Sequence, residues 1–185
     1  MPPANILFVC TGNIFRSPMA EAFLGARVLE LGLDISVESA GTLDGDRVIS
    51  PHVLEVIGTD GTDMAGHRSR RLDVEAVRRA DLLLGMAREH VREAVLLDPS
   101  AWPRSFTFKE FVRRAETVGA LRKGQALSDW LATVGAGRRR EDLLGWSPDD
   151  DVADPIGGGP VEFRATGDEL RDLVSRLVAL VVPAR

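Results

Sequence analysis

The chain has 185 residues, of which 44% are hydrophobic and 28% charged, as expected for a globular protein with one compact core. Its net charge is −5 and its basic residues are scattered, which argues against a nucleic-acid-binding surface. One cysteine excludes an intramolecular disulfide and a thiolate zinc cage. No apolar run approaches the roughly 20 residues that span a bilayer, and the amino terminus lacks a secretory signal. We therefore expect a cytoplasmic protein that binds neither nucleic acid nor membrane.

The first strand and helix have clear patterns. Residues 5–9 form a short, nearly continuous apolar run, typical of a strand buried on both faces of a parallel sheet. A helical stripe of apolar residues follows from Pro18, with Ser17 expected as N-cap and Pro18 as the first helical residue. Gly32 is expected to end this helix.

Strands and helices continue to alternate along the chain. We expect a strand at 35–37 leading to a turn at 39–42, helices at 51–57 and 74–79, a strand at 81–85, a helix at about 88–96, a strand at 105–108 and a carboxy-terminal helix with the apolar stripe Leu170, Leu173, Val174, Leu177 and Val181. This alternation predicts a doubly wound α/β sheet. Residues 118–150 are the least regular and suggest an insertion with a helix at about 127–131. The basic cluster Arg138–Arg140 is expected to be a solvated turn.

The segment after the first strand carries the chemistry. It reads Cys10, Thr11, Gly12, Asn13, Ile14, Phe15, Arg16, Ser17 and Pro18. Five residues between Cys10 and Arg16 let the backbone curl so that its N–H groups form an anion nest, which leads into a helix N-terminus. The same field favours the Cys10 thiolate, the nucleophilic form. The planar fork of Arg16 can hold two phosphate oxygens.

Smaller roles follow for the other residues of this loop. Gly12 permits close approach of the backbone, and Asn13 tolerates a left-handed conformation and can tie the loop together. Ser17 can cap the helix and donate to the thiolate. The alternative is structural: a lone cysteine is usually a buried small hydrophobe, and Cys-x5-Arg arises by chance. The surrounding strand, Gly, Asn and Arg-Ser-Pro favour a phosphate-binding loop.

Residues 8–21 resemble the active-site segment of the low-molecular-weight protein tyrosine phosphatases, a superfamily that includes arsenate reductases and protein-arginine phosphatases. The resemblance extends through residues 39–42, 67–69, 80–86 and 154–155. It implies a single domain over 1–185, interrupted by the insertion at about 118–150. It also implies a four-stranded parallel sheet flanked by helices, with the phosphate-binding loop of residues 11–17 after the first strand. No metal or other cofactor is implied, and hydrolysis would proceed through a phosphocysteine.

A general acid must protonate the leaving oxygen and later activate water. Asp154 lies in a loop that Pro155 stiffens and three glycines make mobile, and the family's Asp-Pro signature assigns this role to it. From the residues alone, Asp149–Asp151 and Asp154 read equally well as an acidic surface loop. Asp151 is the spare candidate.

Two further groups of residues are weaker candidates. His67 resembles a family position that supports the phosphate loop through Asn13 or Ser17. The alternative is that His67 is an ordinary surface histidine. His52 and His90 have no such context. The three tryptophans could line a pocket, although core packing is commoner: Trp102, Trp130 and Trp146.

Departures from the family bear on the substrate. Phe15 replaces the second cysteine of many members, and a single cysteine excludes disulfide-relay arsenate reduction. Asp44-Gly45 and Ile156-Gly157 stand where phosphotyrosine members have aromatic residues. In contrast, the isoleucine at position 14 is more typical of the tyrosine phosphatases than of the arginine phosphatases. We expect a phosphatase of protein phosphotyrosine. The alternatives are a phosphatase of another phosphomonoester, such as a metabolite or phosphosugar, and an inactive phosphate-binding module.

Overall fold

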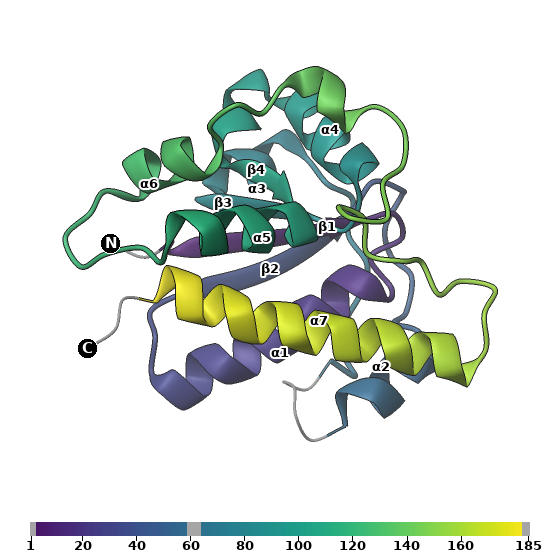
Figure 1. The fold of residues 1–185 in the computed structure, drawn as a ribbon. Coiled ribbons are helices and arrows are strands. Elements are labelled where there is room, and N and C mark those ends of the chain that lie inside the picture. Colours follow the sequence, from purple (N-terminus) through teal and green to yellow (C-terminus); the bar gives the residue numbers. More distant parts are fainter. Residues whose placement is uncertain (1–2, 59–63, 183–185) are drawn as a thin grey trace.

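A four-stranded parallel sheet forms the centre of the molecule (Figure 1). The computed structural model describes residues 3–58 and 64–182. The strands are β1 (Asn5–Cys10), β2 (Ser36–Gly41), β3 (Leu82–Gly85) and β4 (Ser105–Thr107), in the order β2-β1-β3-β4. This arrangement confirms the predicted α/β sheet. No helix in the described ranges is long and apolar enough to cross a membrane.

Helices cover both faces of the sheet, as predicted. On one face lie α1 (Arg16–Leu31), α5 (Phe108–Val118) and α7 (Pro160–Val181), with α2 (Pro51–Ile57) against α7 and α6 (Leu127–Val134) against α5. On the other face lie α3 (Val74–Arg79) and α4 (Arg88–Leu97). Short 3-10 helices span Pro99–Arg104 and Arg140–Leu143. The alternating side chains of β1 explain the two layers, since Phe8 joins the α1/α5/α7 core and Leu7 joins the α3/α4 core.

Some predicted boundaries are wrong. The expected turn at 39–42 is mostly strand, because β2 pairs with β1 as far as Gly41. β4 stops at Thr107, which is the N-cap of α5: its side chain accepts a hydrogen bond from the Glu110 backbone at 3.2 Å. The sequence pattern did not indicate α5. The first helix starts at Arg16 with Phe15 as N-cap, so Ser17 does not cap it.

The basic cluster at 138–140 is only partly solvated. Arg139 and Arg140 are exposed, but the Arg138 side chain is 3% exposed. Its guanidinium lies 4.1 Å from the Trp102 ring and 4.0 Å from the Phe106 ring, and it donates to Glu110 at 2.8 Å. Burial lowers the pKa of Arg138, and the carboxylate of Glu110 opposes that shift. The expectation of a wholly solvated turn is therefore wrong, because the two rings and the carboxylate offset desolvation of the cation.

Candidate active site

The loop between β1 and α1 is curled with its carbonyl groups facing outward. Asn13 has a left-handed backbone with φ of 50°, which reverses the chain within the loop. Backbone N–H groups hold the carbonyls of Cys10, Thr11 and Ile14 at 3.0, 3.1 and 3.0 Å; these donors belong to Thr42, Leu43 and Ser50. Outward carbonyls turn the opposite side of the peptide planes inward, so the loop can present N–H groups to an anion.

Gly41 at the end of β2 permits this curled shape. A Cβ at Gly41 would lie 2.8 Å from the Thr11 carbonyl oxygen and 3.0 Å from the Asn13 nitrogen. Because real Cβ atoms do not approach backbone so closely, only glycine lets the loop settle against β2. This gives a physical reason for the glycine in the segment at 39–42.

Cys10 is the last residue of β1, and its side chain points into the curl. The residue is 3% exposed. Its sulfur accepts hydrogen bonds from the Asn13 backbone N–H at 3.2 Å and from the Ser17 hydroxyl at 3.0 Å. The sulfur also lies beside the N-terminus of α1, where the helix dipole favours negative charge. Both features stabilise a thiolate.

The side chain of Asn13 ties the loop to its surroundings. The residue is fully buried, and its amide donates to Ser17 Oγ at 3.0 Å and to Ser39 Oγ at 2.7 Å. Its amide oxygen accepts from the Arg70 backbone at 2.9 Å. His67 lies on the other side, with Nε2 2.9 Å from the Asn13 carbonyl, which can only accept. The structure thus places Asn13, Ser17 and His67 in one network, whereas the ring of His52 packs on Phe163.

This network ends on the partly buried carboxyl group of Glu21. Ser39 Oγ donates to Glu21 Oε2 at 2.5 Å. Burial raises the pKa of Glu21, and the hydrogen bond from Ser39 opposes that shift. Glu21 therefore anchors the far end of the chain of side chains that begins at the Cys10 sulfur. The sequence had singled out neither Glu21 nor Ser39 by itself.

Arg16 and Asp154 meet across 138 positions of sequence. Arg16 is 5% exposed, and its guanidinium donates to the Val152 carbonyl at 3.1 Å, to Asp154 Oδ2 at 2.5 Å and to Thr11 Oγ1 at 3.4 Å. The other Asp154 oxygen accepts from the Ile156 backbone at 3.1 Å. The Asp154 side chain remains 38% exposed and so lies between the loop and solvent.

Asp151 has a different environment. It is 6% exposed, and its two oxygens accept from the backbone N–H groups of Arg88 and Ser147, each at 2.9 Å. Both oxygens thereby fix the shape of the segment at 147–151. Because both oxygens of Asp151 already accept backbone hydrogen bonds, the carboxylate that contacts Arg16 is that of Asp154.

The tryptophans have three different environments. Trp130 is 1% exposed in the core, and Trp102 packs on Arg138. Trp146 is 72% exposed and lines a cavity of about 330 Å³ together with Arg16 and Asp154. Glu89 and Arg92 of α4 line the same cavity. One of the three tryptophans thus lies beside the site.

His90, which had no sequence context, also lies at this site. It is fully buried, and Nε2 is 3.0 Å from Thr11 Oγ1. Burial, and secondarily the charge of Arg16, lower the pKa of His90 to about 3. Its position just after the third buried strand was the one signal available from sequence. Within the described ranges, no group of three or more His, Cys, Asp or Glu side chains could hold a metal ion.

Comparisons with known proteins agree with this geometry. Residues 5–120 match the family model described as low molecular weight phosphotyrosine protein phosphatase. A protein-arginine-phosphatase of Geobacillus stearothermophilus is 34% identical over 95% of this chain and 94% of its own. The tyrosine phosphatase Etp of Escherichia coli K12 is 31% identical over 65% of this chain and 80% of its own. The crystal structure of a low molecular weight protein tyrosine phosphatase from T. tengcongensis is similar, with a TM-score of 0.70 and 31% identity, over 94% of this chain and 97% of that one.

Proposed function

Because the chain belongs to the low molecular weight phosphotyrosine protein phosphatase family, we propose that it hydrolyses protein phosphotyrosine through a phosphocysteine on Cys10. The phosphate group would be held by the loop N–H groups and by the guanidinium of Arg16. Its oxygens would displace the carboxylate of Asp154 from Arg16. Asp154 would then be free to turn toward the leaving oxygen.

In the first step the Cys10 thiolate attacks phosphorus, and an S–P bond forms as the bond to the tyrosyl oxygen breaks. Protonated Asp154 gives its proton to that oxygen, so neutral tyrosine leaves. The Ser17 hydroxyl, 3.0 Å from the sulfur, stabilises the thiolate before attack and again when it departs. The charge on the phosphoryl oxygens stays balanced by Arg16.

In the second step the Asp154 carboxylate takes a proton from water as the water oxygen attacks phosphorus. The S–P bond breaks, the thiolate returns, and inorganic phosphate leaves. Asp154 is protonated again and can serve the next turnover. One carboxyl thus works first as acid and then as base.

Trp146 is the observation that supports an aromatic substrate. Its ring is 72% exposed and lines the cavity that also contains Arg16 and Asp154. An exposed indole beside a phosphate site offers a flat apolar face for a phenyl ring. It would replace the aromatic residues that are missing at 44–45 and 156–157.

The segment that carries Trp146 is firmly attached to the sheet domain. Asp150 is 8% exposed and forms ion pairs with Arg88 of α4 at 2.6 Å and Arg113 of α5 at 2.7 Å. Lys109 donates to the Pro148 carbonyl at 2.7 Å. These bonds fix the backbone next to an exposed ring, which would reduce the entropy cost of placing that ring against a ligand.

Phosphoarginine is the second candidate substrate. The relative from Geobacillus stearothermophilus, which aligns over 95% of this chain, is named a protein-arginine-phosphatase. The carboxylates of Glu89 and Asp154 line the cavity and could pair with a guanidinium. Against it stands Ile14, whose side chain lies over Gly12 and offers no hydrogen-bond partner to N–H groups.

The test compares peptides of one sequence that carry phosphotyrosine, phosphoarginine or phosphoserine. We expect kcat/KM to be highest for phosphotyrosine. Trp146→Ala should raise KM for that peptide about tenfold, the effect of losing one aromatic contact, whereas Trp146→Phe should not. Cys10→Ser should abolish turnover and keep phosphate binding. Faster hydrolysis of phosphoarginine would favour the second candidate, and hydrolysis of phosphorylated metabolites alone would reject a protein substrate.

The partner in this proposal is a phosphorylated protein. We also propose a cytoplasmic location, where the single thiol stays reduced and the thiolate remains available. An inactive binding module is disfavoured by the geometry, because binding alone requires neither a thiol in the loop nor a carboxylate beside Arg16.

A further inference from the structure

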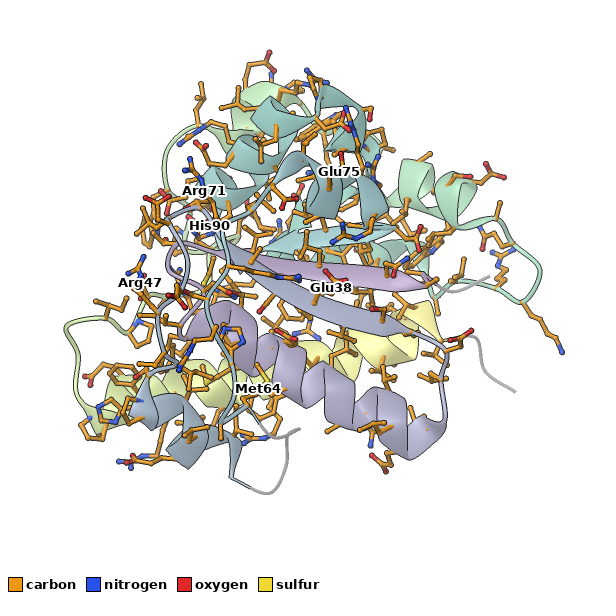
Figure 2. The ribbon with its side chains drawn as sticks, turned by 180° about the vertical axis from the view of Figure 1, so that it is seen from behind. Glu38, Arg47, Met64, Arg71, Glu75 and His90 are labelled. Atoms are coloured by element: carbon orange, nitrogen blue, oxygen red, sulfur yellow. The ribbon has the colours of Figure 1, made fainter. Side chains whose placement is uncertain are left out.

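His90 of α4 is fixed at both ring nitrogens. The Ala87 backbone N–H donates to Nδ1 at 2.9 Å. Because a neutral imidazole has one acceptor and one donor nitrogen, this bond assigns the proton to Nε2. Nε2 lies 3.0 Å from Thr11 Oγ1 and 3.5 Å from Glu89 Oε1, and the shorter contact makes Thr11 the main acceptor. Figure 2 shows His90 at the end of the sheet where the phosphate loop lies.

Gly85 lets the histidine approach this closely. A Cβ on Gly85 would lie 3.1 Å from the His90 Cβ and 2.8 Å from a methyl group of Val91. The missing side chain allows the first turn of α4 to pack directly on β3, which is paired with β1. The histidine is thereby held over the residue that follows the nucleophile.

Thr11 links His90 to Arg16 through hydrogen bonds. Its hydroxyl oxygen accepts from His90 Nε2 and, at 3.4 Å, from Arg16 Nη2. A hydroxyl has two lone pairs and one proton, so two incoming donors leave only its O–H to donate. If a phosphate displaced Asp154, the bonds of Arg16 to Thr11 and to the Val152 carbonyl would still be available to hold the guanidinium.

We infer that His90 is a positioning residue, a neutral donor that orients the Thr11 hydroxyl and, through it, Arg16 for phosphate. The inference rests on the proposed phosphatase function. His90 itself does not touch the substrate. Its full burial and its depressed pKa, about 3, keep the ring uncharged at neutral pH, so the donor at Nε2 is always present. An added positive charge there would face Arg16.

A double-mutant cycle separates this role from simple packing. His90→Asn can still accept from Ala87 but is too short to reach Thr11, whereas the longer amide of His90→Gln can donate to it. Thr11→Val removes the hydroxyl at nearly constant shape. We expect His90→Asn to lower kcat/KM and the affinity for inorganic phosphate about tenfold each, and His90→Gln to restore most of both. In the Thr11→Val background, His90→Asn should have no further effect.

Equal losses from His90→Asn in both backgrounds would overturn the inference, because the histidine would then act independently of Thr11. Phosphate affinity, measured by calorimetry, does not depend on which substrate the enzyme prefers, so failure of the proposed substrate would leave this test intact. If the asparagine variant does not fold, the tautomer of His90 can be measured in the wild-type protein. Nitrogen-15 NMR should show His90 protonated at Nε2, and protonation at Nδ1 would overturn the inference.

Discussion

The carboxylate of Asp154 lies 2.5 Å from the guanidinium of Arg16, so the two groups form an ion pair within the candidate active site. Arg16 is the cation that a phosphate would bind, and Asp154 is the acid that would protonate the leaving group. Under the proposed function, substrate binding would therefore exchange one anion for another on Arg16. Such an exchange would couple phosphate binding to release of the acid.

Asp154→Asn should bind inorganic phosphate more tightly than the wild type, although it turns over slowly. The amide cannot compete with phosphate for Arg16, and a partly exposed ion pair is worth up to about 1 kcal/mol, or about fivefold in affinity. The measurement is the inhibition constant of phosphate or its calorimetric affinity. Asp149→Asn is the matched control, since it removes the same charge from the exposed side of the same segment. Weaker phosphate binding in Asp154→Asn would contradict the exchange.

The protein should lose stability in mild acid because of His90. Its pKa is about 3 in the folded state against an ordinary 6.5, so only the unfolded chain gains this proton as the pH falls through 6.5. Above pH 6.5 the ring is neutral in both states and full stability is retained. At pH 5 the free energy of unfolding is lower by about 2 kcal/mol. The charged groups near the ring are Arg16, which reinforces the shift, and the exposed Glu89 at 3.5 Å.

Denaturant unfolding at pH 7 and pH 5 measures this effect. His90→Gln has no titrating ring at that position, so its difference in unfolding free energy between the two pH values should be smaller than that of the wild type by about 2 kcal/mol. An unchanged difference would mean that the ring is protonated in the fold at pH 5.

The fold was predictable where local sequence and tertiary packing agree. The nearly continuous apolar run at 5–9 is typical of a strand covered on both faces, and the curled loop followed from the residues between Cys10 and Arg16. Element boundaries were less accessible. Thr107 ends β4 because its side chain caps α5, and nothing in the pattern at 105–108 distinguishes a cap from a further strand residue.

Contacts between distant segments were harder to predict. Thr11 and His90 are 79 positions apart and meet only because β1 and β3 are paired and Gly85 admits α4. Arg138 looked like part of a solvated basic turn, because the rings that enclose it come from other elements. The Asp-Pro signature placed Asp154 by family resemblance, and its role as acid stays a prediction. That 118–150 is an insertion also stays a prediction.

Arg138→Ala should destabilise the protein strongly. It removes a buried cation from between two rings and leaves Glu110, which is 9% exposed, with Arg114 as its remaining ion-pair partner. Breaking a buried pair of this kind costs about 3 kcal/mol in unfolding free energy. Arg139→Ala is the matched control, because its side chain is 73% exposed and pairs with Asp142 on the surface. Denaturant unfolding of both variants should show a large loss for the first and little change for the second, and equal losses would contradict the burial of Arg138.

Asp154 can be tested as general acid through the leaving group. An acid that protonates the departing oxygen matters most when that oxygen is strongly basic. Asp154→Ala should therefore slow phosphocysteine formation from phenyl phosphate by about 10²–10⁴-fold. It should have a much smaller effect on para-nitrophenyl phosphate, whose phenolate leaves without help.

Single-turnover measurements over a series of aryl phosphates give the dependence of rate on leaving-group basicity. This dependence should become steeper in Asp154→Ala, and the variant's kcat/KM should no longer require a protonated carboxyl as the pH is raised. Asp149→Ala provides the control, since it lies in the same acidic segment but does not contact Arg16. If Asp154→Ala slowed every substrate by the same factor and kept the wild-type pH profile, Asp154 would serve only as an ion-pair partner of Arg16. The proton would then have to come from a group other than the carboxylate 2.5 Å from Arg16.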